Sequence, residues 1–491
     1  MKRTGFRILA LLLCLTLLLG GAAVSSGAAD IDPNAVVDTS GSELTRISAV
    51  VNGDTETSRG ICWATKTRTE SVVLVSENES LSGAKAFTGG DVVLFMGYYM
   101  HKVVVNGLRA GKTYYYTVGD KSTRSPVCSF TTDPGRGEPI DFLVYADVQA
   151  SNEENFERAA RVVNAVYDLY PDIDFTTSMG DYVNDCTNEE WDYYFEKFAF
   201  IDRNTTNAPV AGNHDGNLRW NWFDSMFNIG AAEGSDTITG VYYSFDCGDA
   251  HFAVLNTNDM YPMSYQQQNW LKNDMNATNA KWKIVMLHRS IYSAGKHTNK
   301  PDSSIMRNVL VPIIDELGID LVVGGHEHCY VRTYPVTGDG VMPETTYVTE
   351  LYNGEETTFA VDPAGSIHVM PSTAGTKRYL INENTMQYIV DASAKMESTR
   401  DKGGVAAHVE IDGDYLVFKA YLVNDETYTP ELYDVFGIKK TTEGAANEDW
   451  EDLPTDFESN NENNVLNFLK QIIWMLFHYL FKVLPGVIVG N

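Results

Sequence analysis

Between residues 40 and 132, apolar and polar residues alternate in short runs that are separated by Gly, Ser and Asn. This period of two with frequent turn residues is typical of strands. The runs are GICWAT, SVVLVSE, YYMHKVVVNGL, KTYYYTVGD and PVCSFTT. We therefore predict an all-β sandwich over residues 35–135. The stretch DPGRGEP at 133–139 carries Pro and Gly and is predicted to be a linker.

From residue 141 the pattern changes to strand, loop and helix. Strands are predicted for DFLVYAD, IDFTTSMGD, APVAGNHD, KWKIVMLH and IDLVVGGH. The run EENFERAARVVNAVYDLYP has helical spacing and is expected to stop at Pro171, and NEEWDYYFEKFAFI is predicted to be a helix that Asn188 caps. This alternation predicts an α/β domain at 139–440, with helices packed on a mixed sheet.

Two further patterns complete the predicted α/β domain. The run VYYSFDCGDAHFAVLNT predicts an antiparallel hairpin. Residues 366–440 return to strand patterns in SIHVMPSTAG, VAAHVEIDGDYLVFKAYLV and ELYDVFGIKK. We expect these last strands to complete a second sheet of the same domain.

The N-terminus has the pattern of a secretory signal peptide, which we place at residues 1–29. A basic start precedes an apolar run at 8–19, which is too short to span a bilayer with ease, and small residues at 26–29 offer a cleavage site. The protein is therefore expected to be secreted, and an extracellular location permits disulfides.

The C-terminus combines an acidic stretch with an apolar one. Residues 441–463 are acidic and rich in Asn, which predicts a disordered linker. Residues 464–491 predict an amphipathic helix with a narrow polar stripe. This helix could dock on the protein's own core, bind a partner protein or lie on a membrane, and we favour contact with a membrane surface. The secreted protein is thus expected to be membrane- or surface-associated.

Composition narrows the choice of partners. The chain has 37 Lys and Arg against 66 Asp and Glu, a formal net charge of −29. This acidity argues against nucleic acid as the main partner, because phosphate backbones are bound by basic patches. The acidity does not argue against a small phosphate substrate, since the positive charge of bound metal ions can locally outweigh the negative charge of the whole protein. Five cysteines follow the signal peptide, and among them Cys62 and Cys128 could form a bridge.

Five short blocks carry side chains that bind metal ions, and each block follows an apolar strand-like run. In an open α/β sheet, ligands gather outside the carboxyl ends of the strands. The set offers carboxylate and amide oxygens and imidazole nitrogens, which suit iron, manganese or zinc. The candidate residues are Asp147 in YADVQ, Asp181 in MGDYVND, Asn213 and His214 in AGNHD, His288 in VMLHRS, and His326 and His328 in VGGHEHCY.

Such a set predicts hydrolysis of phosphate esters. Two metal ions about 3.5–4 Å apart can share one carboxylate and one bridging hydroxide that attacks phosphorus. A nearby His can protonate the leaving oxygen. Taken singly, each residue has a simpler explanation. An Asp or an Asn-His pair after a strand usually belongs to a turn. A single His on an apolar strand is usually a core residue. The ordered set of five blocks favours the metal site.

The order of these motifs resembles the calcineurin-like metallophosphoesterase superfamily. The motifs GNHD, HRSIYS, GHEHCYVRTYP and YDVFGIKK are most similar to those of purple acid phosphatases, which carry a β-sandwich before the catalytic domain. The piece NGLRAGKTYYYTVGD resembles the corner of fibronectin type III-like sandwiches. The resemblance covers roughly residues 40–440. It implies an α/β domain of two mixed sheets flanked by helices, in four layers α/β/β/α.

The resemblance also implies a role for each candidate residue. Asp181 is expected to bridge two metal ions, which would be Fe, Mn or Zn in some combination. The remaining metal ligands would be Asp147 and His328 at the first ion, and Asn213, His288 and His326 at the second. His214 is expected to act as the catalytic group at the phosphate, with Asn213 and His297 also binding substrate.

Several neighbours of these residues have more than one interpretation. Gln149 could lend its amide oxygen to a metal ion or only form a hydrogen bond in the site. Asp215 could orient His214 or serve in a turn. Arg289 could meet the substrate phosphate or form a structural ion pair.

One position departs from the pattern of the purple enzymes. They carry Tyr three residues after the bridging Asp, whereas this chain has Asn184 there. Tyr182 lies one residue after Asp181 and is expected to point elsewhere. We therefore predict a colourless two-metal enzyme.

The sequence favours a secreted phosphoesterase that hydrolyses phosphomonoesters through a metal-bridging hydroxide, as acid phosphatases do. A phosphodiesterase or nucleotidase of the same superfamily is the enzymatic alternative. A non-catalytic surface or adhesion protein with a decayed site is the alternative of another class. The complete set of six ligands argues against decay.

Overall fold

The computed structural model describes residues 44–441, apart from 217–221, 236, 238, 259–262 and 339. The predicted signal peptide, the acidic linker beyond residue 441 and the predicted C-terminal helix lie outside the described residues. Within the described part of the chain, no helix is long and apolar enough to cross a membrane.

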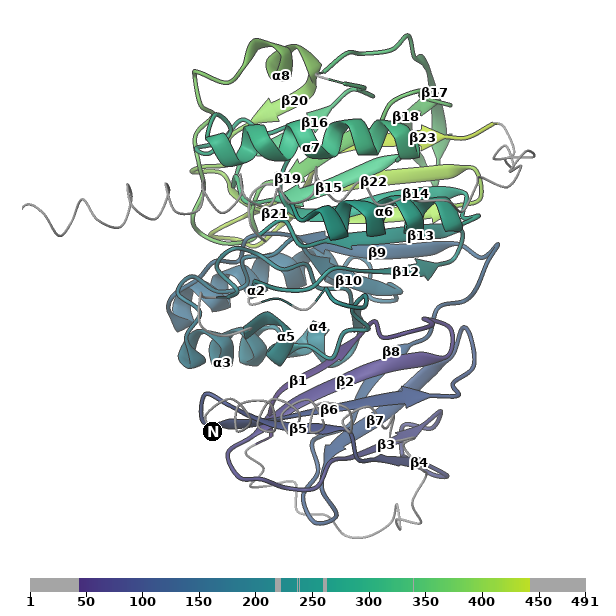
Figure 1. Cartoon of the computed structure of the whole chain (residues 1–491), viewed down its shortest axis with the longest axis vertical. Coiled ribbons are helices and arrows are strands. Elements are labelled where there is room, and N and C mark those ends of the chain that lie inside the picture. Colours follow the sequence, from purple (N-terminus) through teal and green to yellow (C-terminus); the bar gives the residue numbers. More distant parts are fainter. Residues whose placement is uncertain are drawn as a thin grey trace, which may run out of the picture. The chain divides into compact units, whose positions relative to one another are not determined.

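The N-terminal residues form a two-sheet β-sandwich (Figure 1). One sheet has the strand order β1-β2-β6-β5 and the other the order β4-β3-β7-β8. Ile61, Trp63 and Phe130 are fully buried between the two sheets. The strands are β1 (Thr45–Val50), β2 (Ser58–Thr65), β3 (Val72–Ser76), β4 (Lys85–Thr88), β5 (Asp91–Phe95), β6 (Tyr98–Asn106), β7 (Thr113–Gly119) and β8 (Cys128–Thr131).

The sandwich is joined edge to edge to the α/β domain. Strand β1 pairs in parallel with β11 (Thr206–Asn207), so β1, β2, β6 and β5 continue a sheet of the α/β domain into twelve strands. The buried guanidinium of Arg59 donates to Thr206 Oγ1 at 2.8 Å and to the carbonyl of Thr131 at 2.8 Å. Residues 133–139 therefore connect two parts that share a sheet and buried hydrogen bonds.

The α/β domain holds two mixed sheets. The first continues from β11 through β10 (Phe175–Ser178), β9 (Ile140–Tyr145), β21 (Gly403–Asp412), β22 (Tyr415–Asn424), β23 (Pro430–Lys439) and β18 (Glu355–Val361) to β17 (Thr346–Tyr352). The second has the order β12 (Tyr243–Cys247), β13 (Ala250–Leu255), β14 (Trp282–Arg289), β15 (Leu321–Gly325), β19 (Ile367–Pro371), β16 (Tyr330–Thr333) and β20 (Ser393–Glu397).

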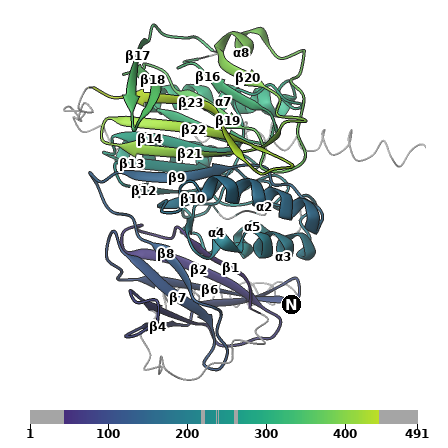
Figure 2. The ribbon, with the colours of Figure 1, turned by 180° about the vertical axis from the view of Figure 1, so that it is seen from behind.

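Helices cover the outer faces of the two sheets, which gives the expected four layers (Figures 1 and 2). Helix α2 (Glu153–Tyr167) packs on β21 and β22, and α6 (Tyr265–Ala277) packs on β13. The remaining helices are α3 (Asn188–Lys197), α4 (Ala199–Asp202), α5 (Trp222–Met226), α7 (Pro301–Leu317) and α8 (Gln387–Ala392).

The core between the two sheets is aromatic. Phe142 and Phe175 of the first sheet stack at 4.5 Å between ring centroids. Phe252 of the second sheet meets both rings edge-on, at 5.5 and 5.3 Å. Burial of such large rings on both sheets is the main force that holds the sheets face to face. Their parallel strands thereby end near one another.

Three local predictions are corrected by the structure. Helix α2 ends at Tyr167, before Pro171, and α3 is capped by Thr187, whose side chain accepts from the amide of Glu190 while that of Asn188 accepts from Arg46 Nη2. The strands of residues 366–440 do not form one sheet. β19 and β20 join the second sheet, whereas β21, β22 and β23 extend the first.

The five described cysteines are all buried free thiols, so Cys62 and Cys128 form no bridge. Successive side chains of a strand point to opposite faces. Because Ile61 and Trp63 face the interior of the sandwich, Cys62 lies on the outer face, whereas Cys128 packs inside. Burial raises the pKa of the Cys62 thiol to about 12 and that of Cys128 to about 11.

Candidate metal centre

The candidate ligands meet at the carboxyl ends of neighbouring parallel strands. β9, β10 and β11 run parallel in one sheet, and β13, β14 and β15 in the other. His288 is the second-last residue of β14. The other candidates follow the ends of strands: Asp147 after β9, Asp181 after β10, Asn213 after β11, and His326 and His328 after β15. Two sheets that face each other thus contribute to one site.

Two ligand groups can be distinguished, and they share one carboxylate. Asp181, His288 and His326 offer ligand atoms within 4.8 Å of one another, and so do Asp147, Asp181 and His328. All five residues are buried. The common member is Asp181, the residue expected to bridge.

Main-chain carbonyls fix the orientation of two of the imidazoles. His288 Nδ1 donates to the carbonyl of Met179 at 2.7 Å, and His328 Nδ1 donates to that of Lys377. Their Nε2 atoms then face carboxylates, at 3.3 Å from Asp181 Oδ1 and 3.4 Å from Asp147 Oδ1. A carbonyl that holds one ring nitrogen leaves the other free to bind a metal ion.

The donor atoms around His288 fit a cation. Asn213 Oδ1 lies 3.1 Å from His288 Nε2, and His326 Nδ1 lies 3.2 Å from the same atom. Burial disfavours a charged ring, yet the carboxylate of Asp181 outweighs it and raises the pKa of His288 to about 9. The site therefore stabilises positive charge at this point, which a metal ion would supply in place of a proton. Oxygen and nitrogen donors of this kind suit iron, manganese or zinc.

The ligands are held in an unfavourable backbone conformation. Asp147, Asp181, His326 and His328 have φ values of 51°, 53°, 75° and 45°, and Gln149 has 36°. Non-glycine residues with positive φ are uncommon and cluster at functional sites. Gly212 permits the close approach of two loops, because a Cβ atom there would lie 1.9 Å from the amide nitrogen of Asp181.

Asp215 organises these two loops and does not contact the His214 ring, contrary to one of our two interpretations. Its buried carboxylate accepts from the amides of Gly212 at 2.7 Å, Asp181 at 2.9 Å and Tyr182 at 2.7 Å. The His214 ring instead donates through Nδ1 to the carbonyl of Asn184, while its amide donates to Asp181 Oδ1 at 2.8 Å. Its Nε2 is thereby left available.

A cleft of about 310 Å³ opens over the ligand groups. Of the six predicted metal ligands, four line the cleft, whereas Asp147 and His288 lie beneath its surface. Four lining side chains were not indicated by the sequence: Lys296, Lys300, Lys377 and Tyr379. The full lining is Gln149, Asp181, Asn213, His214, Arg289, Lys296, His297, Lys300, His326, His328, Lys377 and Tyr379.

His297 and Arg289 both lie beside His326. The His297 ring is 4.6 Å from that of His326, and its amide donates to Glu327 Oε2 at 2.8 Å. Glu327, within the GHEHC motif, was not singled out in the sequence, and burial raises the pKa of its carboxyl to about 7. Arg289 Nη1 lies 3.1 Å from His326 Nε2, which places the guanidinium in the cleft.

Gln149 has a hydrogen-bonding role in the structure. Its side-chain oxygen accepts from Lys377 Nζ at 2.9 Å, and its amide donates to the carbonyl of Asp181 at 2.8 Å. The oxygen that could have bound a metal ion thus holds a lysine.

Tyr182 points into the core, as expected. It is fully buried and packs against Trp191, Tyr194 and Phe227. Among the described residues its hydroxyl has no hydrogen-bond partner. The four histidines outside the motifs, at 101, 251, 368 and 408, are buried as well.

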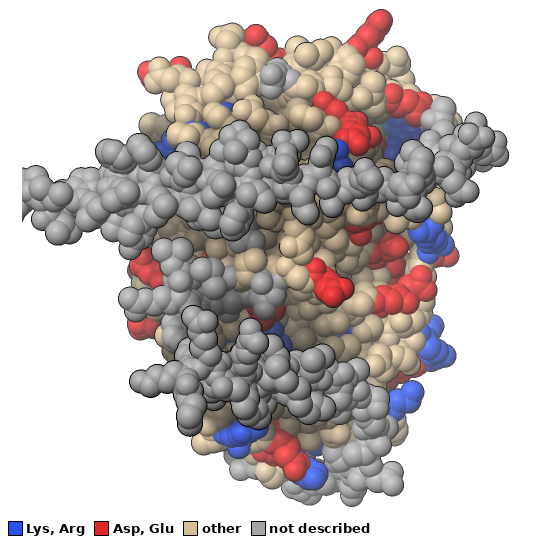
Figure 3. Space-filling model, in the orientation of Figure 1, with Lys and Arg blue, Asp and Glu red and all other residues tan. Residues whose placement is uncertain are grey.

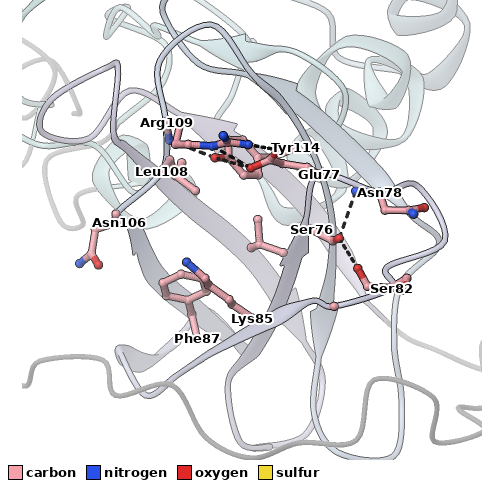
Figure 4. A pocket seen from close by; sticks show the side chains of 13 residues that line it. Ser76, Glu77, Asn78, Ser82, Lys85, Phe87, Asn106, Leu108, Arg109 and Tyr114 are labelled. Carbon is pink, nitrogen blue, oxygen red and sulfur yellow. Dashed lines mark hydrogen bonds and ion pairs between the residues drawn. The ribbon is translucent and has the colours of Figure 1, made fainter.

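A second cavity, of about 400 Å³, lies on the sandwich (Figure 4). Its polar groups pair with one another, since Arg109 Nε donates to Glu77 Oε1 at 3.1 Å and the amide of Arg109 donates to the hydroxyl of Tyr114 at 2.9 Å. The residues that line this cavity lie between Val75 and Tyr114, whereas the two ligand groups lie between Asp147 and His328. The chemistry therefore belongs to the cleft over the metal ligands.

Comparison with protein families identifies both parts of the chain. Residues 140–330 match the family model described as calcineurin-like phosphoesterase. Residues 44–132 match the model described as purple acid phosphatase, N-terminal domain.

Individual relatives are distant. The mouse protein named acid phosphatase type 7 is 24% identical over 60% of this chain and 68% of its own length. The Arabidopsis thaliana protein named purple acid phosphatase 15 is 23% identical, and the match spans 58% of this chain and 55% of the relative.

Among solved structures, a purple acid phosphatase from yellow lupin seeds superposes with a TM-score of 0.64 at 15% identity, over 81% of this chain and 75% of that one. This likeness confirms the fold expected from the sequence. Together with the two family models, it shows that the chain contains a calcineurin-like phosphoesterase domain preceded by a purple acid phosphatase N-terminal domain. The catalytic domain is that of a hydrolase.

Proposed function

We propose that this calcineurin-like phosphoesterase hydrolyses phosphomonoesters at a centre of two metal ions that share Asp181. The observation that carries the proposal is the pair of buried ligand groups with this one carboxylate in common. Asp147 and His328 would complete the first ion's ligands. His288, His326 and the amide oxygen of Asn213 would complete the second.

Two metal ions bound there would supply an activated water and offset the charge that develops on the phosphoryl oxygens. Other residues of the chain would orient the metal ligands. The carbonyls of Met179 and Lys377 keep His288 and His328 in the tautomer that binds metal. The loop contacts of Asp215 hold Asp181 and Asn213 in place.

His214 would transfer the proton to the leaving oxygen. Its ring lines the cleft, and the carbonyl of Asn184 occupies Nδ1, so that Nε2 is the atom free to meet the substrate. A general acid within hydrogen-bond reach contributes about 10²–10⁴-fold to the rate. His297 and Arg289 would bind the phosphate from the side of His326.

A monoester is favoured over a diester by the charge of the cleft. Arg289 lines it next to the metal ligands, with its Nη1 3.1 Å from His326 Nε2. A monoester carries more negative charge at phosphorus than a diester does, so this guanidinium favours the monoester.

Export of the protein is part of the proposal and rests on the sequence of residues 1–29. The apolar residues 464–484 support attachment to a membrane surface after export. Sequencing the N-terminus of the mature protein tests the first point. Deletion of residues 464–491 tests the second, because the shortened protein should leave the membrane fraction.

A substrate panel tests the proposed reaction. The full-length protein, loaded in turn with iron, manganese or zinc, is assayed with 4-nitrophenyl phosphate and with bis(4-nitrophenyl) phosphate. The proposal expects a higher kcat/KM for the monoester. A preference for the diester would assign the chain to the phosphodiesterases, and cleavage of neither ester with any metal would refute the enzyme.

A further inference from the structure

Three lysines surround the mouth of the cleft without carboxylate partners. Lys296, Lys300 and Lys377 are exposed and line the cleft, and none of them forms an ion pair with a described residue. Other lysines of this chain do pair. Lys197, Lys281 and Lys440, for example, each contact a carboxylate. What distinguishes the three cleft lysines is that they gather at one opening, beside the metal ligands.

Two of these ammonium groups lie one aromatic ring away from the metal ligands. The ring of Tyr379 stacks on His328 at 4.5 Å between centroids. Lys296 Nζ and Lys377 Nζ lie 5.8 and 6.0 Å from the centre of the Tyr379 ring. The backbone carbonyl of Lys377 also accepts the hydrogen bond that orients His328. The loop that orients the metal ligand His328 thus also places the ammonium group of Lys377 at the mouth of the cleft.

The third lysine lies at the start of a helix. Lys300 is the residue directly before α7, which begins at Pro301. The first turn of a helix carries partial positive charge, so α7 adds to the potential at Lys300. Lys296 and Lys300 belong to the loop after β14, whereas Lys377 belongs to the loop after β19. Two separate loops therefore place positive charge at one opening.

This arrangement contrasts with the rest of the molecule. The chain has a formal net charge of −29, and on the described part of the face in Figure 3 acidic and basic side chains are interspersed among uncharged ones. Like charges held close together repel unless an anion binds between them. The phosphate that is hydrolysed would already be neutralised by the metal ions and Arg289. Lys296 and Lys300 are therefore available to a second anionic group, and Lys377 has two further N–H donors besides the one that Gln149 Oε1 accepts at 2.9 Å.

We propose that the cleft selects phosphate esters that carry a second phosphate group, which Lys296, Lys300 and Lys377 bind while the first phosphate lies at the metal centre. This inference rests on the proposed function. According to this inference, the three lysines determine which phosphomonoesters are preferred, because the metal ligands alone do not set this specificity.

Initial rates with two related sugars test the inference. The full-length, metal-loaded protein is assayed with fructose 1,6-bisphosphate and with fructose 6-phosphate at low ionic strength. We expect kcat/KM to be at least about tenfold higher for the bisphosphate, the effect of one added charge-assisted contact. The preference should shrink as salt is added, because exposed charges are screened.

Variants locate the effect. In Lys296→Gln and Lys300→Gln the ratio of the two kcat/KM values should fall by roughly threefold each, and in the double variant it should approach one. Lys112→Gln, which removes the same charge from an exposed position on the sandwich, should keep the wild-type ratio. Equal kcat/KM values in the wild type, or an unchanged ratio in the double variant, would overturn the inference alone. If the protein hydrolyses neither the sugar phosphates nor the aryl ester, the proposed function is refuted together with this inference.

Discussion

The His214 ring donates through Nδ1 to the main-chain carbonyl of Asn184. This contact turns Nε2 toward the cleft, and it uses the backbone of Asn184 and not its side chain. Position 184 is where the resemblance to purple acid phosphatases implies a tyrosine. In this chain the same position helps to orient the catalytic candidate.

Replacing His214 should separate catalysis from metal binding. His214→Ala is expected to lower kcat by about 10²–10⁴-fold, because the proton donor is lost. The metal content should stay at the wild-type value, since the His214 ring belongs to neither ligand group. Asn184→Ala is the matched control, and its kcat should stay within a few-fold of the wild type because the carbonyl remains. An Asn184→Ala variant as inactive as His214→Ala would contradict this account.

The visible spectrum tests the position of Tyr182. Because this side chain is fully buried among aromatic rings, the iron-loaded protein should show no intense tyrosinate band. Tyr182→Phe should keep the spectrum, the activity and the metal content. Its stability should change by less than about 1 kcal/mol, since the hydroxyl has no partner among the described residues. A strong visible band that disappears in Tyr182→Phe would show that the tyrosine binds metal.

Asp215 should be essential to the shape of the centre. In Asp215→Ala the buried amides of Gly212, Asp181 and Tyr182 lose their acceptor. Unsatisfied buried donors cost about 1–3 kcal/mol each, so we expect a loss of roughly 3–5 kcal/mol in urea unfolding. Metal affinity should fall as well, because Asp181 and Asn213 flank these amides. Wild-type stability and metal content in this variant would refute the role.

His251 should make stability depend on pH. Its ring nitrogens contact Asp246 Oδ1 at 2.6 Å and Asp274 Oδ2 at 2.9 Å. Burial opposes the charged ring, but the two carboxylates outweigh it and raise the pKa of His251 to about 9. A raised pKa stabilises the fold fully below the unfolded value of about 6.5, and this contribution is lost as the pH rises through about 9.

The comparison of wild type with His251→Gln measures this contribution. The difference in free energy of unfolding should shrink by about 2 kcal/mol between pH 6 and pH 10, a figure reduced for the half-exposed Asp246. Denaturant unfolding at several pH values gives the result. A difference that is constant or grows with pH would contradict the assignment.

Much of the fold follows from local patterns, and the exceptions have physical causes. Alternation identifies β2, β3, β6, β7 and β8, but it does not say which sheet a strand joins. The twelve-stranded sheet depends on the two-residue pairing of β1 with β11, which is too short to leave a sequence pattern. The division of residues 366–440 between two sheets was not predictable either, because alternation along a strand does not identify the neighbouring strands with which it pairs.

The candidate site divides in the same way. Ligands such as Asp181 and His326 could be found because each follows an apolar strand and carries metal-binding chemistry. The contact of His214 could not, because the partner is a main-chain carbonyl that any residue at 184 would provide. Lys377 and Tyr379 lie in an irregular loop far along the chain, and only the folded structure brings them to the cleft.

The central claim is that two metal ions share Asp181 and that this shared centre hydrolyses phosphate esters. Metal analysis combined with turnover of 4-nitrophenyl phosphate tests it in one preparation of the wild type and Asp181→Asn. The account predicts about two metal ions per wild-type chain together with turnover, and loss of both in Asp181→Asn while the fold is retained. A wild-type protein that cleaves no phosphate ester with iron, manganese or zinc, or an Asp181→Asn variant that keeps its metal and its activity, would contradict it.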